Sequence, residues 1–329
     1  MVVKFLIIRF SSIGDIILTT PVIRNLKNQI EGAEIHYLTK KAYLPVLEDN
    51  PFIHKIHLFD NNYSQLLKEL KALEIDFIID LHNNLRSSRF KLTLKRVSFS
   101  FNKLNTEKWL MVNFKLNRLP NVHIVDRYME TLDMFSVKND KAGLDFFVNS
   151  ENELDIKSLP EIFHKGYMAV VIGARHNTKQ LPDEKIILLL QKLHYPVILL
   201  GGKEDEERGN TITAQIGESC LNLSGKLSIQ QSASIVKQSQ LVISHDTGLM
   251  HIAAAFKKTI LSVWGNTIPE FGMTPYLAGE DSEIYGITGL SCRPCSKIGF
   301  DKCPLKHFKC MNQIDLDAIA SKAHKILGI

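Results

Sequence analysis

The chain has 329 residues, of which 45% are hydrophobic and 23% charged, and its formal net charge is +5. These proportions are typical of globular proteins and exclude disordered, collagen-like and low-complexity chains, while the length suggests two domains. No apolar run approaches the roughly 20 residues of a membrane-spanning helix. The apolar N-terminus is interrupted by Lys4 and Arg9 and predicts a buried strand rather than a signal peptide, so we expect a cytoplasmic protein.

In the first half of the chain, β-rich runs alternate with helical patterns. Strands are predicted at residues 2–10, 34–39, 54–59 and 76–81, and helices at 15–29, 42–50 and 63–73. Residues 90–122 are less regular, with a strand-like run at 97–101, and a helix at 124–135 ends this half. Strands that alternate with helices predict βαβ units and a parallel sheet.

A polar stretch at residues 137–165 predicts a linker, after which the alternation begins again. Strands are predicted at 167–172, 197–200, 221–223, 241–244 and 259–264, and helices at 183–194, 205–216, 229–239, 247–256 and 316–327. The sequence thus predicts an α/β protein with two doubly wound domains, residues 1–150 and residues 151–329. Because ligands bind beyond the carboxyl ends of such strands, we expect both domains to face a central cleft.

The loop after the first predicted strand holds a candidate catalytic carboxylate. Ser12 and Asp15 have the spacing of a helix capping box, and Gly14 permits a tight turn. Asp15 is therefore either a helix cap or a general base, because a partly desolvated carboxylate beside the cleft can accept a proton. Asp80 lies inside its predicted strand, and His82 just behind it is the reserve candidate for the base.

Two loops of the second half have the composition of phosphate and nucleotide sites. One is small and polar and ends in Thr178 and Lys179, whose hydroxyl and ammonium suit a phosphate, although a solvated loop has the same composition. The other begins with Gly201 and Gly202, which allow close backbone approach. Glu204 follows, and it either accepts from ribose hydroxyls or complements a helix dipole.

The most informative segment joins a strand end to a helix start at Asp246, Thr247 and Gly248. Free N–H groups and the dipole of the helix favour an anion there. Gly248 lets a ligand approach, and Asp246 can accept from sugar hydroxyls. His251 lies near that ligand or is an ordinary core histidine.

Positive charge is concentrated in residues 86–118, where nine Lys and Arg stand against one acid, Glu107. The stretch is net +8 and leaves −3 for the rest of the chain. It predicts either an anionic partner or a solvated helix face whose acids lie elsewhere. No nucleic acid is expected, because no nucleic-acid-binding module is visible.

Four of the five cysteines crowd into residues 292–310: Cys292, Cys295, Cys303 and Cys310. The spacing approaches a four-thiolate zinc site, although the second pair is wider than usual. In a reducing cytoplasm a metal or free thiols are favoured over disulfides. We therefore expect a structural cluster, either with zinc or as free thiols.

Together these segments resemble the heptosyltransferase family, glycosyltransferase family 9, whose members attach heptose to the inner core of lipopolysaccharide. The matching segments, in family order and spacing, are residues 9–15 with 19–21, 178–182, 201–205, 246–251 with 253–255, and 265–267 with Pro269. The resemblance implies a GT-B fold, two Rossmann-like domains with the acceptor on the first and the nucleotide-sugar donor on the second. It also implies inversion at the anomeric carbon, no DxD metal site and no cofactor for catalysis. The one literal DxD, at residues 315–317, starts the last helix.

The resemblance further implies roles for individual residues. Asp15 would be the base and Lys179 would stabilise the leaving group; the other expected donor contacts are Thr178, Gly201, Gly202, Glu204, Asp246, Thr247, Gly248 and His251, and the acceptor contacts are Ser12, Gly14, His82 and Arg86. The chain departs from the family pattern at Leu181, where many members have Trp, and at Asn266 and Ile268, which replace Pro and Asp. Because of these departures, the resemblance does not identify the donor sugar or its nucleobase.

The expected activity is inverting transfer of a heptose from a nucleotide-diphosphate sugar, ADP-heptose first, to the anionic lipopolysaccharide core. An anionic acceptor at the inner face of the cytoplasmic membrane suits the basic stretch, so peripheral contact with that membrane is expected. Two alternatives remain. A GT-B epimerase or hydrolase of nucleotide sugars would need no basic acceptor face, and a nucleotide-sugar-binding regulator would need no base.

Overall fold

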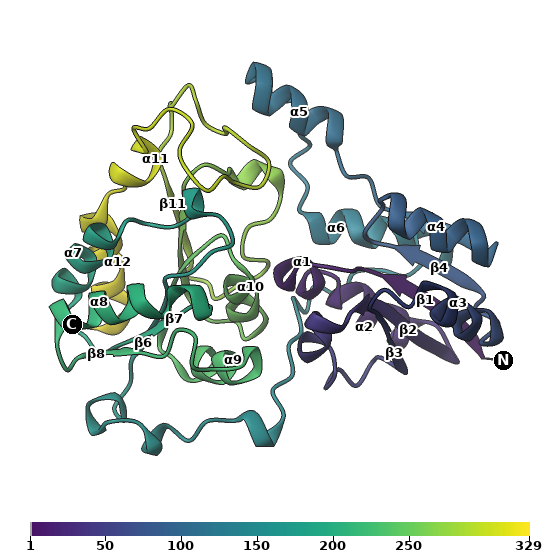
Figure 1. Cartoon of the computed structure of the whole chain (residues 1–329), viewed down its shortest axis with the longest axis horizontal. Helices are drawn as coiled ribbons and strands as arrows, with labels where there is room; N and C mark the ends of the chain where they lie inside the picture. The colour runs from purple at the N-terminus through teal and green to yellow at the C-terminus, as the bar shows by residue number, and fades with distance from the viewer. Residues whose placement is uncertain (1) are drawn as a thin grey trace. The chain divides into compact units, whose positions relative to one another are not determined.

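The computed structural model describes residues 2–329, which form two compact units (Figure 1). One unit contains residues 2–103 and Val122–Phe147, and the other contains Leu104–Asn121 and Val148–Ile329. The main break thus lies close to the expected boundary at residue 150. The excursion Leu104–Asn121 differs from the expectation, because it packs with the second unit although both of its flanks belong to the first.

The first unit is built on a five-stranded parallel sheet in the order β3-β2-β1-β4-β5. Its strands are β1 (Val3–Ile8), β2 (Ala33–Lys40), β3 (Lys55–Phe59), β4 (Phe77–Asp80) and β5 (Val97–Ser100). Its helices are α1 (Ile13–Ile17), α2 (Thr20–Gln29), α3 (Tyr63–Ala72), α4 (Leu85–Leu94) and α6 (Ile124–Met129), with 3-10 helices η1 (Lys41–Val46) and η2 (Glu130–Phe135).

The second unit has a six-stranded parallel sheet in the order β11-β10-β9-β6-β7-β8. Its strands are β6 (Met168–Val171), β7 (Val197–Leu200), β8 (Cys220–Asn222), β9 (Leu241–His245), β10 (Ile260–Trp264) and β11 (Glu283–Gly286). Its α-helices are α5 (Asn105–Phe114), α7 (Asp183–Leu193), α8 (Glu206–Ile216), α9 (Ile229–Gln238), α10 (Gly248–Ala255), α11 (Lys309–Asn312) and α12 (Leu316–Leu327). Its 3-10 helices are η3 (Ser150–Asn152), η4 (Ile156–Ser158), η5 (Glu161–Phe163), η6 (Asn177–Lys179), η7 (Lys203–Asp205) and η8 (Pro269–Phe271).

Both sheets are doubly wound, which confirms the expected α/β fold. In each unit the chain begins in a central strand, adds two strands on one side and then fills the other side. The strands on either side of the reversal are β1 and β4 in the first unit and β6 and β9 in the second. Ligands of doubly wound sheets bind beyond the carboxyl ends of these strands, so this topology places the candidate sites.

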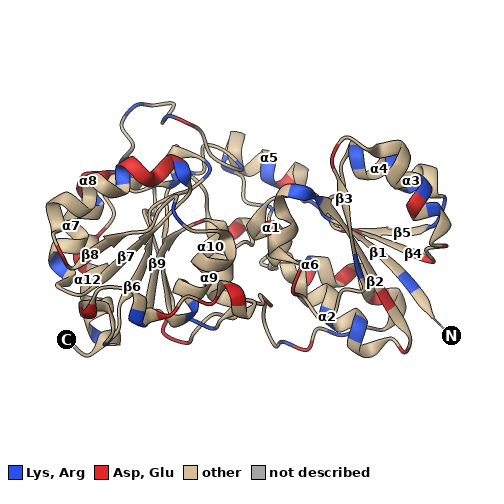
Figure 2. Ribbon diagram, turned by 60° about the horizontal axis from the view of Figure 1, so that its bottom comes forward, with Lys and Arg blue, Asp and Glu red and all other residues tan. Residues whose placement is uncertain are grey.

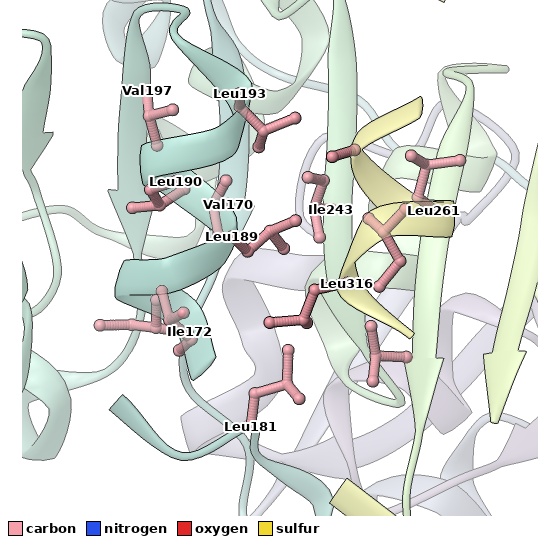
Figure 3. Close-up of a cluster of buried hydrophobic side chains, with 14 of the residues drawn as sticks. Val170, Ile172, Leu181, Leu189, Leu190, Leu193, Val197, Ile243, Leu261 and Leu316 are labelled. Carbon is pink, nitrogen blue, oxygen red and sulfur yellow. The ribbon is translucent and has the colours of Figure 1, made fainter. Parts of the chain in front are cut away.

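Apolar side chains at helical spacing explain why α7 forms and how it docks. Leu189, Leu190 and Leu193 of α7 pack with Leu316 of α12 above the strands of the second sheet (Figure 3). Each of the four is less than a tenth exposed. Burial of a leucine side chain contributes roughly 1.5–3 kcal/mol, so this face fixes both helices on the sheet.

Several expected elements are wrong. Residues 42–50 form the 3-10 helix η1 and turns, with Pro45 inside η1, and proline cannot donate a helical hydrogen bond. The irregular region 90–122 contains the second half of α4 and all of α5. Helix α5 buries no side chain, so no apolar pattern marks it. The edge strand β11 was not predicted. None of the helices in residues 2–329 combines the length and apolarity that crossing a bilayer needs.

A buried histidine pair joins β2 to β3. The His36 Nδ1 and His57 Nε2 atoms are 3.0 Å apart, and His57 Nδ1 lies 3.0 Å from a carboxylate oxygen of Glu69. His36 is 1% exposed. Burial and, secondly, the neighbouring His57 lower the pKa of His36 to about 4, so its imidazole is neutral at pH 7.

We expect the free energy of unfolding to fall as the pH drops below about 6.5, the pKa of an unfolded histidine. Between pH 6.5 and 4, His36 binds a proton in the unfolded chain but not in the folded chain, so lowering the pH favours unfolding. Between pH 7 and 5 this residue alone should cost about 1–2 kcal/mol. Denaturant unfolding of His36→Gln should show a shallower pH slope. His194→Gln, at an exposed histidine, is the control, and an equal slope in wild type and His36→Gln would contradict the argument.

Candidate active site

A buried ion pair follows strand β1, beside its neighbour β4. Arg9 Nη2 lies 2.6 Å from Asp15 Oδ1, and Arg9 is 8% exposed. Arg9 also donates to the Leu81 carbonyl and, at 3.0 Å, to the Tyr128 hydroxyl. No role for Arg9 is predicted from the sequence, because nothing in a strand-end arginine indicates which carboxylate it contacts.

Asp15 also caps the short helix α1, as its spacing predicts. The Ser12 backbone N–H and hydroxyl donate to Asp15 Oδ2 at 3.1 and 2.8 Å. Burial alone would raise the pKa of Asp15, but the Arg9 charge and the Ser12 donors together hold that pKa below its usual value. The carboxylate is therefore ionised at neutral pH. Gly14 lies within α1 and does not adopt a positive φ, so the expected tight turn is wrong.

The two other candidates for a base differ sharply. Asp80 is fully buried and accepts from Lys91 Nζ and Ser87 Oγ, each at 2.8 Å, so its carboxylate is occupied by structural bonds. His82 is half-buried, and burial followed by nearby positive charge lowers its pKa to about 4. At neutral pH both His82 and Asp15 are therefore in the form that accepts a proton.

The basic stretch at residues 86–118 is divided between the two units. Arg86 lies in α4 of the first unit, with its guanidinium 5.6 Å from the ring centroid of Phe10 and 5.7 Å from that of Phe59. Residues 104–118 of the stretch belong to the second unit. The stretch is therefore not one continuous surface of a single unit.

In the second unit, the loops after β6 and β9 bring Lys179 and Asp246 together. Lys179 Nζ lies 2.5 Å from Asp246 Oδ2, and the two side chains are 16% and 11% exposed. The Thr267 hydroxyl, from the loop after β10, donates to the same oxygen at 3.1 Å. Thr247 and Gly248 begin helix α10 directly behind Asp246. The Lys179 ammonium and the N-terminus of α10 thus lie next to each other at the point where the strand order reverses. Doubly wound folds bind nucleotides at this point.

The loop that carries Lys179 is fastened on both sides. Thr178 is 2% exposed; its hydroxyl donates to the Phe300 carbonyl at 3.0 Å and accepts from the Phe300 N–H at 2.8 Å. Arg208 donates to the carbonyls of Ile172 and Leu181. Thr178 therefore faces the cysteine-rich segment and positions its neighbour Lys179, and its expected contact with the donor stays a prediction.

Gly201 is required by the packing of its own loop, whereas a Cβ at Gly202 would meet only the far end of the exposed Glu204 side chain. A Cβ at Gly201 would lie 2.8 Å from the Asp205 side chain, and one at Gly202 would lie 2.5 Å from the Glu204 carboxylate. Buried Asp205 accepts from the Gly202 N–H at 2.8 Å, and Glu204 is exposed. His251, in helix α10, is 2% exposed, the position of a core histidine.

Arg293 is a structural residue whose role is not predicted from the sequence. It donates to the carbonyls of Gly265, Ile287 and Thr267 at 2.7, 2.7 and 2.9 Å. The cysteine-rich segment thereby supports the loop of Thr267, the hydroxyl partner of Asp246. Backbone carbonyl acceptors leave no signal in the sequence, because every residue has a carbonyl.

The four clustered cysteines lie within electrostatic range of one another. Burial, and after it the neighbours Cys295, Cys303 and Cys292, raises the pKa of the Cys310 thiol to about 11. Cys292 Sγ lies 3.9 Å from His307 Nε2. Within residues 2–329, no three His, Cys, Asp or Glu side chains are grouped so that they could hold a metal ion. Because the described residues hold no ready-made ligand set, we expect free thiols, and the choice between zinc and free thiols stays a prediction.

We therefore expect less than one equivalent of zinc in protein purified without a histidine tag. A zinc thiolate site would hold its metal through dialysis and block its thiols, whereas free thiols react. Elemental analysis tests this, and thiol titration of the denatured protein without reductant tests in addition that no disulfide has formed. All five cysteines should titrate. One tightly held zinc per chain would show that the segment binds metal.

Known proteins resemble this chain over nearly its whole length. The family model described as glycosyltransferase family 9 (heptosyltransferase) matches residues 63–303. Lipopolysaccharide heptosyltransferase 1 of Campylobacter coli is 23% identical over 288 residues, covering 80% of this chain and 84% of the relative. The structure of E. coli ADP-heptose LPS heptosyltransferase II superimposes with a TM-score of 0.75 at 19% identity, covering 98% of both chains.

A third likeness is to a ligand-bound structure. E. coli heptosyltransferase WaaC with ADP-2-deoxy-2-fluoro heptose has a TM-score of 0.69 at 17% identity, covering 98% of this chain and 99% of that one. These likenesses confirm the GT-B fold that the sequence resemblance implies.

Proposed function

This chain belongs to glycosyltransferase family 9, the heptosyltransferases, and is a glycosyltransferase; we propose that it moves a heptose from ADP-heptose to the inner core of lipopolysaccharide. The names of its relatives supply the donor and acceptor of this proposal. The observation that carries it is the family match over residues 63–303. The Lys179–Asp246 pair supports it, because it places an ammonium where such folds bind a diphosphate.

On the donor side, we assign Lys179 to the diphosphate. The ammonium neutralises the charge that develops on the leaving group, and the N-terminus of α10, with Thr247 and Gly248, binds phosphate oxygens. Asp246 holds Lys179 in place and accepts from a sugar hydroxyl. Exposed Glu204 is assigned to the nucleoside.

On the acceptor side, we assign Asp15 as the general base. The acceptor hydroxyl attacks the anomeric carbon while its proton passes to the Asp15 carboxylate. The bond from that carbon to the diphosphate oxygen breaks, and ADP leaves with the electron pair. Because attack and departure use opposite faces of the sugar, configuration inverts. Lys179 and the helix dipole supply the positive charge for this step, so the proposal requires no metal.

The test is incubation of the purified protein with ADP-heptose and heptose-deficient lipopolysaccharide core. Mass spectrometry should show an acceptor heavier by one heptosyl residue, with an equimolar release of ADP. Release of ADP that does not depend on the acceptor would instead indicate a hydrolase. Binding of ADP-heptose without turnover would indicate a regulator, and conversion of the nucleotide sugar to its isomer an epimerase.

We also propose that the protein works at the inner face of the cytoplasmic membrane, with the basic residues of α4 toward anionic lipid or acceptor. Arg86→Glu/Arg89→Glu should weaken sedimentation with phosphatidylglycerol vesicles. The difference from wild type should vanish near 1 M salt, because the Debye length falls from about 10 Å at 0.1 M to about 3 Å. Lys91 is left intact since it pairs with Asp80.

The matched control for this prediction is Lys68→Glu/Lys71→Glu. These lysines are exposed on α3 of the same unit and undergo the same change of charge. Equal sedimentation of all three proteins, insensitive to salt, would reject a role for α4.

A further inference from the structure

All three exposed aromatic side chains in residues 2–329 lie in two segments of the second unit. Trp109 and Phe114 of α5 are 50% and 59% exposed, and Phe300 of the cysteine-rich segment is 39% exposed. Their exposed aliphatic neighbours in the same segments are Leu116, Ile298 and Leu305. Isolated exposed apolar residues need no explanation, but aromatic residues gathered on one surface indicate a binding partner.

Tertiary structure brings the two segments together. Lys115 Nζ, at the end of α5, donates to the Pro294 carbonyl at 2.7 Å. Lys297 Nζ donates to the Asn105 carbonyl, at the start of α5, at 3.4 Å. Helix α5 is thus held at both ends by residues 294–297, although about 180 residues separate them in the chain. We call Leu104–Asn121 and residues 292–310 together the anchor surface.

Helix α5 owes its place to few buried contacts. None of its side chains is buried, and the Trp109 and Phe114 rings contact each other edge to face, with centroids 5.2 Å apart. In water, contact between two exposed rings adds little to the stability of the helix that carries them. Because the unit buries neither ring, the surface that they form is a candidate for contact with a partner outside the chain.

The charge of the anchor surface identifies what covers it. It carries eight Lys and Arg against two acids, Glu107 and Asp301; Figure 2 colours these positions. The basic residues are Lys108, Lys115, Arg118, Arg293, Lys297, Lys302, Lys306 and Lys309. A second copy of this chain would bring the same net positive charge and be repelled. Aromatic side chains flanked by Lys and Arg are instead the composition of surfaces that lie in the headgroup layer of an anionic bilayer.

We propose that the anchor surface binds an anionic lipid bilayer, with Trp109 and Phe114 inserted at headgroup depth and the lysines of both segments near the lipid phosphates. The inference does not depend on the transfer reaction, since it needs neither donor nor acceptor. It gives the cysteine-rich segment a second task beside its support of the Lys179 loop. It also differs from a purely electrostatic contact, because part of the binding survives high salt.

Trp109 reports its own insertion. The chain has two tryptophans, and the other, Trp264, is 1% exposed. With phosphatidylglycerol-containing vesicles, and no donor or acceptor, the emission of the wild-type protein should shift to shorter wavelength and be quenched by brominated lipid. Trp109→Phe should lose both responses while still sedimenting with the vesicles. Pure phosphatidylcholine vesicles should bind more weakly.

Two further variants measure the contributions of apolar and charged groups. Trp109→Ser/Phe114→Ser should reduce vesicle affinity by at least about tenfold and remove the part that persists at high salt. Lys302→Glu/Lys306→Glu should reduce affinity at low salt only. The control is Ile162→Ser/Leu188→Ser, which removes two apolar side chains that are each 45% exposed in the same unit. Circular dichroism checks that each variant is folded.

Two results would overturn the proposal. One is a Trp109 emission that does not respond to anionic vesicles. The other is a concentration-dependent dimer in solution that Trp109→Ser/Phe114→Ser abolishes, because a second copy would then cover the surface. A protein that binds vesicles but transfers no heptose would reject the proposed function and leave the anchor surface standing. A protein that transfers heptose to a lipid-free core but does not bind vesicles would support the proposed function and reject the anchor surface.

Discussion

Asp15→Asn is expected to lower kcat at least ~100-fold, the smaller end of what positioned proton transfer contributes. The amide keeps the shape of the carboxylate and one acceptor oxygen, but it cannot take the proton of the acceptor hydroxyl. Steady-state rates with saturating ADP-heptose and acceptor measure the effect. If Asp15 were only a helix cap, Asp15→Asn would leave turnover per folded molecule unchanged.

The stability of this variant depends on Arg9. Judged by the capping role alone, Asp15→Asn should leave the melting temperature nearly unchanged. The structure adds the buried Arg9 guanidinium, which loses its counter-charge in the variant. Removing one partner of a buried ion pair costs about 3–5 kcal/mol; since Asp15 is 22% exposed, we expect about 1–3 kcal/mol here. Rates must therefore be compared well below the melting temperature of the variant.

Two companion variants separate proton transfer from the surrounding hydrogen bonds. Ser12→Ala removes a hydroxyl donor to the same carboxylate but keeps the base, so its kcat should fall less than about tenfold. His82→Gln tests the reserve base. Because Asp15 and His82 are both unprotonated at pH 7, the pH profile near neutrality does not distinguish them, and the variants must. A normal rate in Asp15→Asn with a large loss in His82→Gln would transfer the role to His82.

Lys179→Ala is expected to lower kcat by about 10²–10³-fold and to weaken ADP binding, because it removes a preorganised positive charge from the leaving group. Acceptor binding should be spared. Calorimetric titration with ADP and single-turnover rates with ADP-heptose separate the two losses. In the variant the Asp246 carboxylate keeps the hydrogen bond from the Thr267 hydroxyl but loses its positive partner, so repulsion between that carboxylate and the diphosphate adds to the loss of affinity.

Matched variants identify the cause of this loss. Lys179→Arg keeps the charge and should recover part of the ADP affinity. Lys325→Ala removes an exposed lysine from helix α12 of the same unit and should have no effect. Wild-type ADP affinity and turnover in Lys179→Ala would refute the assigned role.

Much of the architecture could be predicted because its signals are local. Apolar runs of strand length alternate with helical patterns, and this alternation alone indicates two doubly wound sheets. The positions of Asp15, Lys179 and Asp246 just after strands also indicate which loops hold the chemistry. Elements without an apolar pattern escaped this reasoning, as α5 did because it buries no side chain.

By itself, then, the sequence determined the fold class, the family resemblance and the candidate side chains, all of which depend on neighbouring residues. Only the tertiary structure decided their partners: Arg9 for Asp15, Asp246 for Lys179, and residues 294–297 for helix α5. Lys179 and Asp246 are 67 residues apart in the chain, and they meet because β6 and β9 are neighbours in the sheet. Strand order is set by packing of the whole chain. The sequence of one loop therefore does not indicate which other loop lies beside it in the fold.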